Sequence, residues 1–171
     1  MTSPAAATPR TRQATPDDAP AITAIVNEAI ANTTASFWEE PRPISEARDA
    51  IAHDPDRYPW IVAVDETAQI LGFASSKIMN PRPGYRISAE VSIYIAPHAR
   101  GRGVGNAIYT DLFARLKSIG YRNIVAGIAL PNAASVRLHE SMGMQQVGCF
   151  KQIGTKFGET LDVGWWQCVL N

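Results

Sequence analysis

Arg100-Gly101-Arg102-Gly103-Val104-Gly105 is the stretch that decides the fold class of this 171-residue chain. Before it, residues 87–95 alternate, which predicts a strand with Val91, Ile93 and Ile95 on one face and Glu90, Ser92 and Tyr94 on the other. After it, apolar residues recur at helical spacing until Gly120, at Val104, Ile108, Leu112, Leu116 and Ile119. A strand that passes through glycines into a helix lets the backbone approach a ligand and points the positive helix end at it. That arrangement binds pyrophosphate.

Three interpretations of this glycine-rich turn compete. A Walker-type loop ends in Gly-Lys-Ser/Thr, which this stretch lacks, and a dinucleotide fingerprint needs glycine or alanine where the chain has Asn106. The turn Arg/Gln-x-x-Gly-x-Gly/Ala, which binds the pyrophosphate of coenzyme A, matches Arg100, Gly103 and Gly105 in register. The alternative without function is a glycine-rich surface turn.

The rest of the chain predicts a mixed α/β fold in one domain, residues 10–171, behind a disordered tail at residues 1–9. Thr15-Pro16-Asp17-Asp18 has the pattern of a helix start, and one apolar helical face follows, made of Ile22, Ile25, Val26, Ala29 and Ile30. A second helix is expected near residues 45–53, and a short helix at 132–142 follows the one that ends at Gly120. Strands are expected at 60–64, 70–78 and 124–129, followed by two C-terminal strands that turn near residues 157–159.

Composition and charge narrow the class of function. Lys+Arg and Asp+Glu both number 16, so no overall field favours nucleic acid or an anionic membrane surface. No secretory signal and no apolar stretch of about 18 residues is present, and a cytoplasmic location is expected.

Cys149 and Cys168 match no metal-ligand spacing, and no metal site is expected. Counting outward from the predicted hairpin turn puts the two thiols roughly opposite each other. Buried free thiols are nevertheless favoured in a reducing compartment.

Beyond the glycine-rich turn, the chain resembles the GNAT superfamily of acetyltransferases. Segments similar to its phosphinothricin acetyltransferase group are Arg57-Tyr58-Pro59-Trp60, Ala89-Glu90, Leu130-Pro131-Asn132, Ser135-Val136-Arg137-Leu138-His139-Glu140 and Asp162-Val163-Gly164. Segments closer to the relatives that acetylate methionine sulfoximine and methionine sulfone are Gly84-Tyr85-Arg86 and Gly154-Thr155-Lys156-Phe157-Gly158. Together these matches extend over residues 11–169.

The resemblance implies a twisted mixed sheet in which two parallel strands, ending near Ile95 and Ala129, splay apart and hold acetyl-CoA. The pantetheine arm is expected along Ser92 to Ile95, with Ile93, Tyr94 and Ile95 as contacts. The pyrophosphate is expected on the N–H groups of the turn, with Arg100, Gly101, Arg102, Gly103, Val104, Gly105 and Asn106 as contacts. Asn132 and Ser135 are expected to contact the cofactor as well, although Asn132 also suits a plain helix N-cap.

Acetyl transfer to an amine needs a base, because an α-amino group with a pKa of about 8 is mostly protonated at neutral pH. Glu90 matches the catalytic glutamate of the phosphinothricin group, and the alternative is a solvent-facing strand residue. His139 matches the histidine of that group and is expected to protonate the coenzyme A thiolate, although a lone helical histidine is often structural. The backbone N–H of Tyr94 or Ile95 is the candidate for the oxyanion site.

An amino-acid acceptor offers a carboxylate that arginine can bind in bidentate fashion. Arg82 and Arg86 precede Glu90 in a Pro/Gly-rich loop, and Arg86 corresponds to an arginine of the sulfoximine-acetylating relatives. Asn80 and Arg82 replace other residue types of those relatives, which leaves side-chain specificity open. Ser92 completes the expected acceptor site, and Phe37 and Trp38 are expected either to line it or to pack in the core.

The hypothesis that follows is an acetyl-CoA-dependent N-acetyltransferase acting on a small amino-acid-like amine. Acetylation of a protein N-terminus or a polyamine is an alternative on the same fold. A catalytically silent acetyl-CoA-binding module is an alternative of another class. The resemblance also implies a homodimer, formed through the C-terminal strands and Trp165-Trp166.

Overall fold

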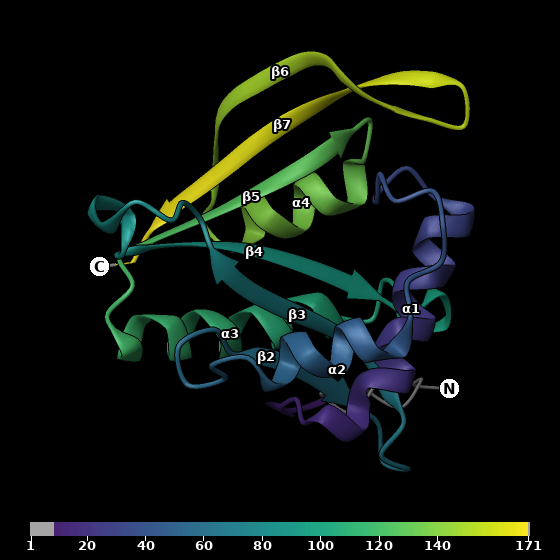
Figure 1. Ribbon diagram of the computed structural model, residues 1–171, viewed down its shortest axis with the longest axis vertical. Coiled ribbons are helices and arrows are strands. Elements are labelled where there is room, and N and C mark those ends of the chain that lie inside the picture. The colour runs from purple at the N-terminus through teal and green to yellow at the C-terminus, as the bar shows by residue number, and fades with distance from the viewer. Residues whose placement is uncertain (1–8, 171) are drawn as a thin grey trace, which may run out of the picture.

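A mixed sheet of seven strands forms the centre of the computed structural model, which describes residues 9–170 (Figure 1). The strands are β1 (Arg10–Gln13), β2 (Trp60–Val64), β3 (Ile70–Ile78), β4 (Ser88–Ile95), β5 (Asn123–Leu130), β6 (Gln145–Lys156) and β7 (Glu159–Val169). Their spatial order is β1-β2-β3-β4-β5-β7-β6, and β4 and β5 form the one parallel pair in this part of the chain. The predicted tail at residues 1–9 lies outside the described residues, apart from Pro9.

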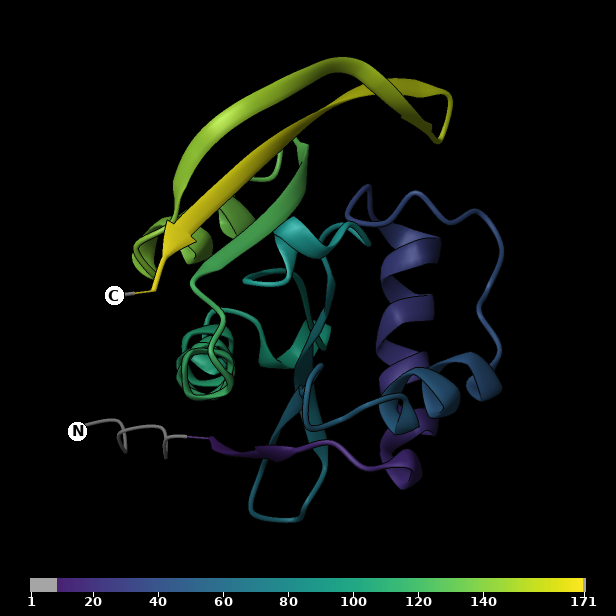
Figure 2. The same ribbon diagram turned by 60° about the vertical axis from the view of Figure 1, so that its left-hand side comes forward.

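Helices cover both faces of the sheet. Within residues 9–170 they are α1 (Ala19–Asn32), α2 (Ile44–Ala52), α3 (Val104–Ile119) and α4 (Ala133–Ser141), with 3-10 turns at Pro16–Asp18, Pro83–Tyr85 and Pro97–Ala99. In Figure 2, α1 and α2 lie on one side of the sheet and α3 lies on the other. The expected mixed α/β fold is therefore confirmed, and most of the predicted bounds differ from the observed ones by one or two residues. The predicted start of the first helix is a 3-10 turn that precedes α1, and β1 was not predicted.

Helix α3 shows why the glycine pattern predicted its ends. Gly103 and Gly120 flank it with φ of 78° and 106°, a left-handed conformation that a side chain disfavours. Val104, Ile108, Leu112 and Leu116 are buried against the sheet, and each contributes about 1.5–3 kcal/mol by leaving water. Ile119 is the last residue of the helix and is 42% exposed, and it borders a separate, smaller cavity together with Gly120 and Tyr121.

The parallel pair β4–β5 is joined over only part of its length. Ser88 pairs with Asn123, Ala89 with Ile124 and Glu90 with Val125, and no later pair forms although both strands continue for five more residues. Figure 1 shows the two strands diverging from there. The splay expected of the two parallel strands is present, and Glu90 lies where it begins.

The C-terminal hairpin corrects the expected position of the two cysteines. Its turn lies at residues 157–158 as predicted, but irregularities between Gln146 and Gly148 and between Phe150 and Gly154 shift the register of β6 against β7. Cys149 therefore faces Gly164, four residues from Cys168, which is about 13 Å along a strand. The two thiols are not opposite each other, and both are free and half-buried.

Trp166 is 2% exposed and belongs to the core, so of the pair Trp165-Trp166 only Trp165, which is half-buried, can contribute to the predicted dimer surface.

The described residues contain neither a membrane-spanning helix nor a cluster of metal ligands. None of the helices within residues 9–170 combines the length and the apolar composition of a membrane span. Among the same residues, no group of three or more His, Cys, Asp or Glu side chains is arranged to hold a metal ion.

Candidate active site

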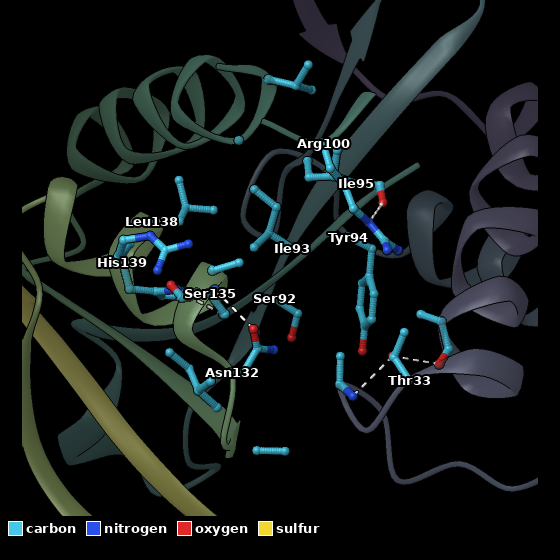
Figure 3. Close-up of a pocket in the computed structure, with 18 of the residues that line it drawn as sticks. Thr33, Ser92, Ile93, Tyr94, Ile95, Arg100, Asn132, Ser135, Leu138 and His139 are labelled. Carbon is cyan, nitrogen blue, oxygen red and sulfur yellow. Dashed lines mark hydrogen bonds between the residues drawn. The ribbon is translucent and has the colours of Figure 1, made fainter. Parts of the chain in front are cut away.

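A cavity of about 920 Å³ lies between the splayed ends of β4 and β5 and the N-terminal ends of α3 and α4 (Figure 3). All of the predicted cofactor contacts except Arg102 line it, together with Ser92 and His139: Ile93, Tyr94, Ile95, Arg100, Gly101, Gly103, Val104, Gly105, Asn106, Asn132 and Ser135. Residues as far apart in sequence as Ser92 and His139 thus meet in one cavity, because β5 leads the chain from the end of α3 to α4.

The edge of β4 that faces the splay has no strand partner. On its other side, β4 pairs with β3 as far as Ile95 opposite Gly72. On the splayed side its pairing with β5 stops after Glu90, which leaves the backbone polar groups of residues 91–95 on that side without a ladder. Such an edge can pair with the amide groups of an extended ligand as an added strand does.

The glycine-rich turn closes one end of the cavity. Gly101 and Gly103 have φ of 72° and 78°, and nothing lies within 4 Å of where their Cβ atoms would be, so the backbone is open to a ligand. The guanidinium of Arg100 bonds the carbonyl of Ile95 at 3.2 Å and pairs with Glu28 of α1 at 3.1 Å. The first turn of α3 points its free N–H groups into this opening, which favours an anion.

Gly105 has a different reason for being glycine. A Cβ there would lie 2.8 Å from a methyl carbon of Leu138, so the missing side chain allows α3 and α4 to pack closely. Asn106 supports the same contact by donating a hydrogen bond to Ser141 Oγ at 2.9 Å. The two positions shape the cavity through helix packing as well as by lining it.

Asn132 caps α4. Its Oδ1 accepts a hydrogen bond from the N–H of Ser135 at 3.1 Å, as the N-cap interpretation predicted, and the residue lines the cavity as well. The cap fixes the first turn of α4 and so places Ser135, Leu138 and His139 on the cavity wall.

His139 is 3% exposed and hydrogen-bonded at both ring nitrogens. Its Nδ1 lies 2.8 Å from the carbonyl oxygen of Ser135, which can only accept, so Nδ1 carries the proton. Its Nε2 then accepts from the hydroxyl of Tyr109 at 2.9 Å. Burial penalises the imidazolium and lowers the pKa of His139 below its usual value near 6.5, so the ring is neutral at neutral pH.

Tyr109 is the partner that sequence reasoning missed. It is fully buried, its ring packs against Phe113, and burial raises the pKa of its hydroxyl. Its position directly after Ile108 on the buried face of α3 was the available signal, because a buried hydroxyl has to find a hydrogen-bond partner.

Glu90 stands at the closed end of the splay. Its side chain is 22% exposed and pairs with Lys77 of β3 at 3.0 Å. It does not line the cavity itself, but it shares a strand face with Ser92, which does. The carboxylate is therefore one strand repeat from the cavity wall.

The structure does not bring the two arginines to this cavity. Arg86 borders a separate cavity of about 340 Å³ with Arg57 and Tyr121, and donates to the carbonyl of Pro83 at 3.2 Å. Arg82 also lies outside the cavity wall, in the loop whose Asn80 side chain accepts a bond from its N–H.

Phe37 does not line the cavity either. Other parts of the wall are formed by Asn32, the last residue of α1, by Thr33 to Ala35 of the loop that follows it, and by Phe157 in the β6–β7 turn. No periodic or motif signal marked residues 32–35 beforehand, whereas Phe157 lies in the Gly154–Gly158 segment that is similar to the sulfoximine-acetylating relatives.

Comparison with known proteins agrees with this geometry. The profile of the acetyltransferase (GNAT) family matches residues 25–144. Phosphinothricin N-acetyltransferase of Streptomyces coelicolor is 36% identical over 167 residues, covering 96% of this chain and 98% of that protein. The L-methionine sulfoximine/L-methionine sulfone acetyltransferase of Pseudomonas paraeruginosa is 37% identical over 157 residues, 90% of each chain.

A solved structure also matches. It is a GNAT superfamily phosphinothricin acetyltransferase from Sinorhizobium meliloti in complex with AcCoA, with a TM-score of 0.91 and 33% identity, covering 96% of this chain and 89% of that one. Fold, cavity and sequence agree with the resemblance seen in the motifs, and the chain belongs to the GNAT family of acetyltransferases.

Proposed function

We propose that this protein transfers the acetyl group of acetyl-CoA to the amine of a small amino-acid-like molecule, such as phosphinothricin, methionine sulfoximine or methionine sulfone. The observation that carries the proposal is the end of β4–β5 pairing after Glu90, which opens a free strand edge beside the N-terminus of α3 in one cavity. The names of the Streptomyces and Pseudomonas relatives support the class of acceptor.

The residues present fit acetyl-CoA, which would supply the acetyl group as an activated thioester. The free edge of residues 91–95 offers backbone donors and acceptors to the amides of its pantetheine arm. The N–H groups from Gly101 to Asn106 offer a positive end to its pyrophosphate. Asn132 and Ser135 line the same cavity from the start of α4, where they would contact the arm.

The amine must lose a proton before or during its attack, and we assign Glu90 to accept it, directly or through water. Its position at the start of the splay, one strand repeat before Ser92, supports this role. Negative charge then develops on the carbonyl oxygen, for which the N–H of Tyr94 or Ile95 is the proposed donor.

The thiolate that leaves needs a proton, and we assign its delivery to His139. Because the neutral ring holds its one proton on Nδ1 against Ser135, the donor form is the imidazolium. Burial lowers the pKa of His139, which makes the imidazolium a minor species at neutral pH but a stronger acid. After donation the ring returns to the tautomer that Ser135 and Tyr109 stabilise.

The first experiment is thiol release from acetyl-CoA with a panel of amines that includes phosphinothricin, methionine sulfoximine, methionine sulfone, common amino acids, spermidine and a peptide. Turnover confined to the small amino-acid analogues is the expected result. Turnover with spermidine or the peptide instead would replace the proposed acceptor class. Acetyl-CoA binding with no turnover of any amine would favour the silent module.

Glu90→Gln tests the mechanism in the same assay. We expect kcat to fall by about 10² to 10⁴ while acetyl-CoA affinity stays unchanged. Lys77→Met is the matched control, because it breaks the Lys77–Glu90 ion pair but keeps the carboxylate. Unchanged turnover in Glu90→Gln would remove Glu90 from the mechanism.

We also infer a homodimer, supported by the exposed apolar side chains along the edge strand β6. Val147, Phe150 and Ile153 are 59%, 56% and 59% exposed there. Sedimentation at micromolar concentration is expected to give twice the 18.6 kDa chain mass, and Phe150→Glu is expected to lower it. A wild-type mass of 18.6 kDa would contradict the dimer.

A further inference from the structure

The turn of the β6–β7 hairpin approaches the loop of residues 33–43 that joins α1 to α2 (Figure 2). Phe157 of the turn and Thr33 to Ala35 of the loop line the same cavity, although more than 120 positions separate them in the sequence. In Figure 3, Thr33 lies on the opposite side of the Tyr94 ring from Arg100, which follows the strand into the glycine-rich turn. The two segments therefore border the part of the cavity that the pyrophosphate turn does not use.

The first contact between loop and hairpin is the ring of Phe37 on Gly154. A Cβ on Gly154 would lie 2.7 Å from Cζ of Phe37 and 3.0 Å from two further ring carbons. Gly154 does not have a positive φ, so backbone conformation is not the reason for glycine at this position. The reason is space, because any side chain here would displace the Phe37 ring.

The second contact is the ammonium of Lys156 with the backbone of Trp38. Lys156 is 4% exposed and its Nζ donates a hydrogen bond to the Trp38 carbonyl. The same Nζ lies 5.1 Å from the ring centroid of Phe157, within the range of a cation–π interaction. Burial of an ammonium is costly unless it is hydrogen-bonded, so this bond ties the loop firmly to the hairpin.

We propose that these two contacts, Phe37 on Gly154 and Lys156 to the Trp38 carbonyl, act together as an acceptor latch. The latch holds loop 33–43 against the hairpin and so fixes Thr33 to Ala35 and Phe157 around the acceptor amine. Gly154 and Lys156 are positioning residues, since they act through the loop and do not line the cavity. The role in acceptor binding rests on the proposed function, whereas the mechanical connection does not.

Steady-state kinetics of Lys156→Met test the role in acceptor binding. Loss of a hydrogen bond from a charged donor is expected to raise the KM for the acceptor by about tenfold or more, with the KM for acetyl-CoA within about twofold of wild type. Lys156→Arg, which keeps a cationic donor, is expected to restore most of the acceptor affinity. Lys151→Met is the matched control, because Lys151 lies on the same strand but is exposed and paired with Asp162.

Gly154→Ala breaks the latch at its other contact and guards against a folding defect specific to Lys156→Met. Its expected effect is the same rise in the acceptor KM. Gly148→Ala is its control on the same strand, because a Cβ at Gly148 meets nothing within 4 Å. An acceptor KM that stays at the wild-type value in both latch variants would overturn the role in acceptor binding.

Amide hydrogen exchange of the free protein tests the mechanical connection without any activity. Exchange in residues 33–43 is expected to be faster in Lys156→Met and Gly154→Ala than in wild type, and unchanged in the two controls. Wild-type exchange rates in both latch variants would overturn the latch itself. If the wild-type enzyme acetylated none of the amines, the proposed function would fail, and the exchange rates would still decide whether the latch exists.

Discussion

Tyr109→Phe removes one hydroxyl group from the core and keeps the aromatic ring, so it leaves the packing of Tyr109 on Phe113 in place. The hydroxyl is the hydrogen-bond donor to Nε2 of His139 at 2.9 Å. The other ring nitrogen is engaged by the Ser135 carbonyl at 2.8 Å, which fixes the tautomer and prevents Nε2 from becoming a donor in the neutral ring. The substitution therefore leaves a buried acceptor without a partner.

The expected cost follows from that orphaned nitrogen. A buried acceptor that loses its donor costs about 1–3 kcal/mol, because its desolvation is no longer compensated. For a protein of this size each kcal/mol lowers Tm by about 2–4 °C, so the expected decrease is roughly 2–12 °C. Tyr85→Phe is the matched control, since Tyr85 is 41% exposed and its hydroxyl can bond to water.

The assay is urea unfolding at pH 8 of wild type, Tyr109→Phe, His139→Leu and the double variant. If the cost arises from the unpaired Nε2, the Tyr109→Phe change should cost much less in the His139→Leu background, where that nitrogen is gone. An equal cost in both backgrounds would refute the reasoning and assign the loss to packing around the Tyr109 ring. A loss below about 0.5 kcal/mol in the wild-type background would refute it as well.

Three further predictions concern the contact between β3 and β4, the loss of stability in acid through Asp18, and the pH dependence of stability through His139. Gly72→Ala would place a Cβ 2.8 Å from the Tyr94 carbonyl oxygen and force β3 away from β4. Calorimetry is expected to show a free energy of unfolding lower by about 1–3 kcal/mol and weaker binding of acetyl-CoA. Gly84→Ala is the control and is expected to change neither, because a Cβ there meets nothing within 4 Å. Arg12 donates hydrogen bonds of 2.7 and 2.8 Å to the Asp18 carboxylate, and these lower the pKa of Asp18. The stabilisation is therefore present above about pH 3.8 and is lost as the pH falls through the lower folded pKa. Asp18→Asn should flatten that part of a curve of stability against pH, and an unchanged slope would contradict the assignment. Burial lowers the pKa of His139, so the unfolded chain binds the proton more readily than the folded protein does. The stability should therefore decrease as the pH falls below about 6.5. His139→Leu should remove that decrease, and a decrease that persists in this variant would assign it to another group.

Local patterns in the sequence were sufficient for the elements and for the cofactor side of the cavity. The alternation of residues 87–95 and the stripe of α3 each depend on neighbours within a few positions, so periodicity and the glycines at 103 and 120 determine them. Asn132 at its cap position follows from the same local chemistry. The motif match added the splay of the two parallel strands, which periodicity alone does not encode.

The tertiary structure decided which distant side chains meet. Tyr109 and His139, from different helices, share a hydrogen bond, and Phe37 of one loop packs on Gly154 of a distant strand. Arg86 lies at a separate cavity and not in the one where it was expected. The register of β6 is the clearest case, because its irregularities move Cys149 away from Cys168 by four positions. Such contacts depend on the summed packing of helices against a twisted sheet, and a single bulge shifts every side chain beyond it, so no pattern confined to a short window of sequence determines them.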